Sequence, residues 1–111
     1  MSLKEKILIA DDSEMNQMLL EEILSDKYEY VMAKDGTEAV DILEKNDDID
    51  LVMLDINMPK MDGFGVLEIM NLRHWISEVP VIIISSESDV DFIRRGYDLG
   101  ASDYISRPFD L

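Results

Sequence analysis

Short apolar runs alternate with longer stretches of helical spacing along the chain, and this alternation restricts the possible folds more than any other sequence feature. The runs are Ile7–Ala10, Tyr30–Ala33, Leu51–Leu54, Val81–Ile84 and the brief Tyr104–Ile105. Between them, apolar residues recur at helical intervals, in the sets Met15, Leu19 and Ile23, flanked by Leu20 and Leu24; Ala39, Val40 and Leu43; Phe64, Leu67 and Met70; and Val90, Ile93 and Tyr97. Alternating strands and helices predict an α/β domain with a parallel sheet and right-handed crossovers.

The first, third and fourth runs are continuously apolar, which is typical of strands that are buried on both faces. With 111 residues, the chain is long enough for one core, so we expect a single domain over 1–111. Leu111 lies four positions past Arg107. We therefore expect the domain to stop before a helix that would follow the fifth strand, and the uncovered sheet face to favour self-association as a homodimer.

Charge and composition disfavour several classes of function. Ten basic and 25 acidic residues give a net charge of −15, which repels phosphate backbones and anionic lipid surfaces. We therefore expect no direct binding of nucleic acid or membrane by this domain. The chain has no cysteine, which excludes disulfides and thiolate metal sites. No apolar run approaches the roughly 20 residues that span a bilayer, and we expect a cytoplasmic location.

Polar residues follow four of the apolar runs within one or two positions. Ligands of an open parallel sheet bind beyond the carboxyl ends of its strands, so these are the residues that a ligand would meet. They are Asp11 and Asp12 after the first run, Asp55 after the third, Ser85 after the fourth and Arg107 after the fifth. The pattern predicts that all of them project at one edge of the sheet.

This residue set indicates a particular chemistry. Three converging carboxylates repel one another unless a cation neutralises them, and oxygen ligands without histidine or cysteine favour Mg²⁺ or Mn²⁺. A nearby arginine and a serine hydroxyl can hold the remaining oxygens of a phosphoryl group. A carboxylate nucleophile that forms an acyl phosphate is a known kind of covalent catalysis.

Each residue also has a simpler explanation. Asp11-Asp12-Ser13 before a helix is by itself more often a helix cap than a metal site. Asp55 could end a strand, Ser85 could be a loop hydroxyl, and Arg107 could be a surface cation. Only their joint placement on successive strand ends favours a site. The single histidine, His74, is interpreted as a surface or partly packed residue.

At these positions the chain resembles the receiver domains of two-component signalling, from Lys6 to Phe109. The segments that carry the resemblance are Ala10–Ser13, like the family's acidic pair; Asp55–Gly63, like its phosphoacceptor loop; Pro80–Ser86, like the strand that ends in its Ser/Thr switch; and Gly100–Ile105, like the approach to its last strand. The resemblance implies a flavodoxin-like, doubly wound sheet of five parallel strands in the order 2-1-3-4-5.

The resemblance also implies roles for individual residues. Asp55 would be the phosphoacceptor. Mg²⁺ would be bound by Asp12 directly, by Asp11 through water, and by Asp55 and the carbonyl of Asn57. Ser85 and Tyr104 would form the switch, while Asn57 and Glu87 would influence the rate of dephosphorylation. Arg107 departs from the family, which usually has lysine there; it keeps the charge but binds phosphate through a planar fork.

The function so implied is that of a signalling phosphoacceptor, not an enzyme. It would take a phosphoryl group from a sensor histidine kinase or a phosphotransfer protein and control an output domain or partner. Sequences with Arg-Pro-Phe at this place resemble receivers that are attached to cyclic-di-GMP enzymes, which suggests a related output. The alternative is a degenerate receiver that serves only as a protein-interaction module.

Overall fold

The computed structural model describes residues 4–86 and 89–107. In chain order the elements are β1 (Lys6–Ala10), α1 (Glu14–Leu24), β2 (Glu29–Ala33), α2 (Gly36–Lys45), β3 (Leu51–Asp55), α3 (Gly63–Leu72), β4 (Val81–Ser85), α4 (Val90–Asp98) and β5 (Asp103–Ser106), with short 3-10 helices at Ser25–Lys27 and Trp75–Ser77. All the strands pair in parallel, in the order β2-β1-β3-β4-β5. The predicted fold class and strand order are confirmed.

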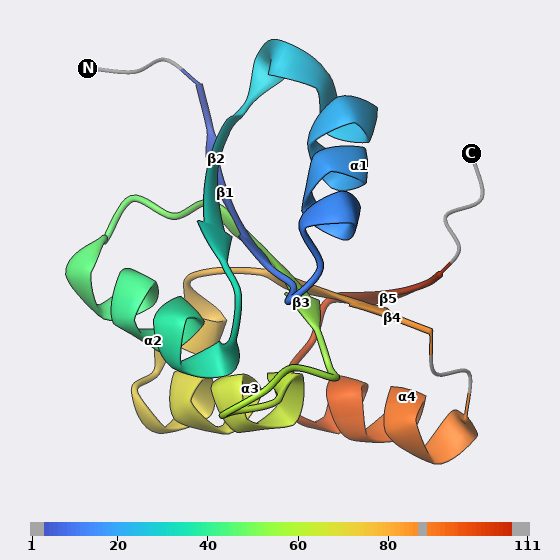
Figure 1. Cartoon of the computed structure of the whole chain (residues 1–111). Coiled ribbons are helices and arrows are strands. Elements are labelled where there is room, and N and C mark those ends of the chain that lie inside the picture. Colours follow the sequence, from blue (N-terminus) through green and yellow to red (C-terminus); the bar gives the residue numbers. More distant parts are fainter. Residues whose placement is uncertain (1–3, 87–88, 108–111) are drawn as a thin grey trace.

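The helices cover the two faces of the sheet unequally. In Figure 1, α1 lies on one face, and α2, α3 and α4 lie on the other. Alternate residues of β1 separate accordingly, because Ile7 and Ile9 pack in the cluster beneath α1, whereas Leu8 and Ala10 pack in the larger cluster beneath the other helices. Burial on both faces explains why this strand reads as a continuous apolar run.

Two helices present a different face to the sheet from the one that their apolar spacing suggested. Met15, Leu19 and Ile23 of α1 are 72%, 44% and 40% exposed, while Gln17 and Leu20 are buried. In α4, Val90 and Tyr97 are exposed, and Gly96 is the buried residue. Most of these apolar residues therefore lie outside the core, although both helices form where they were expected.

The register brings the carboxyl ends of the strands together. Ala10 pairs with Ala33 and with Leu54, Asp55 pairs with Ile84, and Ser85 pairs with Ser106. Residues that follow these positions must therefore project at one edge. None of the helices within residues 4–86 and 89–107 has the length and apolarity to cross a membrane.

Candidate functional site

Three carboxylates meet at the carboxyl edge of the sheet. Asp11 follows β1 and Asp55 ends the adjoining β3, and each of these side chains is almost fully buried, while Asp12 is exposed. One oxygen from each of the three carboxylates lies within 4.8 Å of the others. Such a set of hard oxygen donors fits a divalent cation of the Mg²⁺ or Mn²⁺ kind. His74, the single histidine, is exposed at the start of the second 3-10 helix, as predicted for a surface residue.

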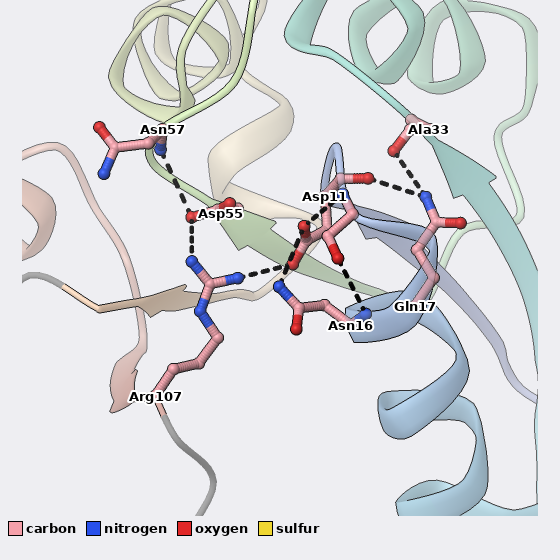
Figure 2. Close-up of polar contacts among 8 residues, drawn as sticks. Asp11, Asn16, Gln17, Ala33, Asp55, Asn57 and Arg107 are labelled. Atoms are coloured by element: carbon pink, nitrogen blue, oxygen red, sulfur yellow. Dashed lines mark hydrogen bonds and ion pairs between the residues drawn. The ribbon is translucent and has the colours of Figure 1, made fainter.

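Arg107 connects two of these carboxylates. Its backbone N–H donates to the Ser85 carbonyl over 2.9 Å, which holds the chain beside the end of β4. Figure 2 shows the guanidinium between Asp11 and Asp55: Nη1 donates to Asp11 Oδ2 over 2.9 Å, and Nη2 donates to Asp55 Oδ1 over 3.3 Å. The two arms thus contact two different carboxylates. This arginine lies inside the site, so the reading of it as a surface cation is wrong.

The environment of Asp55 opposes its negative charge. Burial raises the pKa of this carboxyl from its ordinary 3.8 to about 6, and the neighbouring Asp11 carboxylate adds to the increase. The Arg107 guanidinium and the backbone N–H groups of Asn57 and Ile56 lower the same pKa. With the balance near 6, the carboxylate is mostly ionised at neutral pH, which is the form that can act as a nucleophile.

Asp11 is held from two sides. Its Oδ1 accepts from the Ser13 backbone N–H over 2.9 Å and from Asn16 Nδ2 over 3.5 Å. Ser13 is the N-cap of α1, and its Oγ accepts from the Asn16 backbone N–H over 3.2 Å. The cap interpretation is thus correct for Ser13, while the other oxygen of Asp11 faces Arg107 (Figure 2).

The other predicted residues lie at different distances from this cluster. Ser85 ends β4 and is fully buried, beside the end of β3. Asn57 is exposed, and its backbone N–H lies 3.4 Å from Asp55 Oδ1. Tyr104 lies inside β5, opposite Ile83, and packs against the larger core cluster. Glu87 lies outside the described residues.

Gln17 was missed by the sequence analysis. It belongs to α1, is buried, and donates from Nε2 to the carbonyls of Asp11 and Ala33. The available signal was a polar residue three positions before Leu20, on the face of the helix that the sheet covers. That signal was hidden because the exposed apolar residues of α1 suggested another face.

Residues 7–111 of the sequence match the response regulator receiver domain family. It is 43% identical to a probable transcriptional regulator, ycf27, of Porphyridium aerugineum over 96% of this chain and 43% of that protein. It is 40% identical to the response regulator RR06 of Streptococcus pneumoniae over 95% of this chain and 47% of that protein. The chain therefore spans less than half the length of these relatives.

Solved structures give the same fold. The chemotaxis protein CheY4 of Vibrio cholerae superposes with a TM-score of 0.86 at 28% identity, covering 96% of this chain and 89% of that one. A Francisella response regulator receiver domain superposes with a TM-score of 0.86 at 29% identity, covering 96% of this chain and 87% of that one.

Proposed function

The chain belongs to the response regulator receiver domains, and we propose that Asp55 accepts a phosphoryl group from a sensor histidine kinase or a phosphotransfer protein. The observation that carries this proposal is the position of the Asp55 carboxylate, which is buried beside two further carboxylates and the Arg107 guanidinium. Such a group is a signalling phosphoacceptor rather than the centre of an enzyme with a separate substrate.

We propose that Asp11, Asp12 and Asp55 hold Mg²⁺ or Mn²⁺, with the Asn57 carbonyl as a further ligand. The donor set supports this, because one carboxylate oxygen from each of the three aspartates lies within 4.8 Å of the other two. Both cations prefer oxygen ligands. When bound, such a cation neutralises the clustered carboxylates and screens the charge of an incoming phosphoryl group.

The transfer, which we propose to be Mg²⁺-dependent, takes place at the Asp55 side chain. An Asp55 oxygen attacks phosphorus and forms the new P–O bond as the P–N bond to the donor histidine breaks, and the imidazole leaves with that electron pair. The Arg107 arm that contacts Asp55 then holds a phosphoryl oxygen. Burial of Asp55 keeps water from the acyl phosphate, and Asn57 and Glu87 influence how readily water attacks it.

The switch that follows is proposed for Ser85 and Tyr104. The Ser85 hydroxyl would donate to the phosphoryl group, and its strand is paired to β5, which carries Tyr104. Movement of Tyr104 would change the surface of α4 and β5. The name of one relative, a probable transcriptional regulator, favours an output that acts on transcription. A cyclic-di-GMP output, a homodimer, a cytoplasmic location and the lack of nucleic-acid binding by this domain stay predictions.

The test is adduct formation. Incubation of the chain with Mg²⁺ and acetyl phosphate should give one phosphoryl mass increment, and beryllofluoride should change the amide NMR spectrum around Asp55. Asp55→Asn should remove both responses, whereas the matched change Asp47→Asn, in an exposed turn, should keep them. An unmodified wild-type chain, or an adduct that persists in Asp55→Asn, would contradict the proposal.

One observation supports the alternative of an interaction module. Met15, Met18, Leu19 and Ile23 form an exposed apolar surface on α1, with Met18 68% exposed. Exposed apolar surface of this kind is typical of protein contacts. If the chain is only such a module, Mg²⁺ and beryllofluoride leave its spectrum unchanged, and sedimentation velocity shows a self-association that Met18→Glu weakens and Asp55→Asn does not.

A further inference from the structure

Gln17 is a buried amide side chain that contacts the backbone of the acidic pair. It is 7% exposed and projects from the first half of α1 toward the ends of β1 and β2. Its Nε2 donates to the Asp11 carbonyl over 2.8 Å and to the Ala33 carbonyl over 3.3 Å, as Figure 2 shows. One side chain thus connects the residue that follows β1 with the last residue of the neighbouring β2.

The Asp11 carbonyl lies where the strand pairing stops. The β1–β2 register ends at Ala10 and Ala33, and one further backbone bond, from Asp11 N–H to the Ala33 carbonyl over 3.0 Å, follows it. The chain then turns into α1 at Ser13. Asp11 is 1% exposed, so its carbonyl depends on a partner within the protein, and an unpaired buried carbonyl is costly. Gln17 supplies that partner.

This carbonyl belongs to the peptide plane that joins Asp11 to Asp12. Because the peptide group is planar, fixing its oxygen also fixes the direction in which the Asp12 backbone leaves. The Asp11 carboxylate is held separately, through Ser13 and Asn16. The relative placement of the two carboxylates therefore depends on the hydrogen bond from Gln17.

We propose that Gln17 is a positioning residue for the cation site, which sets the affinity for the divalent ion by orienting the Asp11–Asp12 peptide. The inference rests on the proposed function, since it concerns the cation that assists phosphorylation of Asp55. Partners that orient metal ligands from behind typically change metal affinity by about 10- to 100-fold when they are removed.

The test compares two buried residues of the same helix. Gln17→Met keeps a chain of similar length but has no N–H donor, whereas Leu20→Ala lowers stability in the apolar cluster beneath α1 and leaves the contacts of Asp11 intact. Binding of Mn²⁺ is measured by the EPR signal of the free ion, with Mg²⁺ as competitor, and thermal melts in EDTA report folding. Should Gln17→Met not fold, Gln17→Asn replaces it, because its amide is one methylene too short to reach both carbonyls.

We expect Gln17→Met to weaken Mn²⁺ and Mg²⁺ binding by at least about 10-fold, with Leu20→Ala close to wild type. At saturating Mg²⁺, the rate of phosphorylation by acetyl phosphate should approach that of wild type, since the reacting groups are unchanged. Wild-type affinity in Gln17→Met, or an equal loss in Leu20→Ala, overturns the positioning role. A wild-type chain that binds no Mn²⁺ overturns the proposed function as well, so the two failures are distinguishable.

Discussion

The buried carboxyl of Asp55 makes the stability of the fold depend on pH. Its pKa is raised to about 6 by burial, against 3.8 ordinarily, so the folded chain holds this proton more tightly than the unfolded chain does. Stability falls with rising pH wherever the folded state binds more protons. As the pH rises from 3.8 to about 6, the Asp55 carboxyl therefore lowers the free energy of unfolding progressively. Above about pH 6 the whole of this destabilisation is present.

Asp55→Asn should consequently stabilise the cation-free protein near pH 7.5. The expected gain in the free energy of unfolding is at most about 3 kcal/mol, reduced by what Arg107 loses when its partner is neutral. Near pH 4.5 the gain should be much smaller, because the folded wild-type carboxyl is then protonated. Urea unfolding in EDTA at the two pH values checks this, and an equal difference at both would contradict it.

Arg107 should control the same titration. Its guanidinium lowers the pKa of Asp55, so Arg107→Ala should move that pKa further above about 6. Arg107→Lys keeps the charge but has no fork to contact Asp11 and Asp55 together, so an intermediate pKa is expected. Carboxyl ¹³C NMR of Asp55 in EDTA measures the three values. An unchanged Asp55 titration in Arg107→Ala would show that the contact over 3.3 Å has no electrostatic effect.

The sequence predicted the positions of some site residues but not the contacts of others. Asp11 and Asp55 follow buried runs on strands that prove to be neighbours, so strand-end reasoning placed them correctly. The contact between Arg107 and Asp11 joins residues 96 positions apart, and no local pattern indicates which carboxylate a distant guanidinium will reach. Gln17 was missed because the exposed apolar residues of α1 suggested that another face of the helix is buried, and because its partner is a backbone carbonyl, which no side-chain pattern indicates.

At the scale of elements, the start of α2 holds the loop that follows Asp55. The Gly36 backbone N–H donates to the Met61 carbonyl over 3.0 Å, and Lys60 Nζ lies 3.8 Å from Asp35, the N-cap of α2. The approach at Gly36 is so close that a Cβ there would lie 2.3 Å from the Met61 carbonyl oxygen. The placement of Asn57, in the same loop, therefore depends on α2 as well as on β3.

Gly36→Ala should separate α2 from this loop. Because the clash is with backbone, we expect a loss of about 1–3 kcal/mol in the free energy of unfolding and shifted NMR signals at Asn57. Gly96→Ala is the control, since its Cβ would meet only the terminal Cδ1 of Ile83, at 2.5 Å, which can rotate away. The gain in helix propensity should keep that variant within about 1 kcal/mol of wild type. Equal losses in the two variants would contradict this account.

Helical spacing predicted the helices but not their orientation. α1 carries apolar residues on two faces, and both sets have the same period, so spacing alone cannot tell which set the sheet covers. The face with Leu20 is buried, while the face with Met15 and Leu19 is exposed. The strands β1, β3 and β4 were predicted more accurately, because their burial on both faces leaves no alternative orientation to choose.

At the scale of the whole molecule, the net charge of −15 should allow cations to stabilise the fold in two ways. Like charges repel in the compact state, and added salt weakens that repulsion at every exposed carboxylate. A cation that binds specifically at Asp11, Asp12 and Asp55 stabilises the fold by a second route, because the unfolded chain lacks the assembled site. The two effects differ in their dependence on cation type.

Mg²⁺ should therefore raise the melting temperature more than NaCl does at equal ionic strength. At a Mg²⁺ concentration of about 100 times its Kd, specific binding contributes about 2.7 kcal/mol. Asp12→Asn should abolish this excess and leave the response to NaCl, because Asp12 is an exposed member of the carboxylate cluster. Calorimetric melts of both chains, in each salt and in EDTA, make the comparison. If Mg²⁺ and NaCl stabilise the wild-type chain equally at matched ionic strength, the carboxylates act only as part of the diffuse charge, and the specific site is disproved.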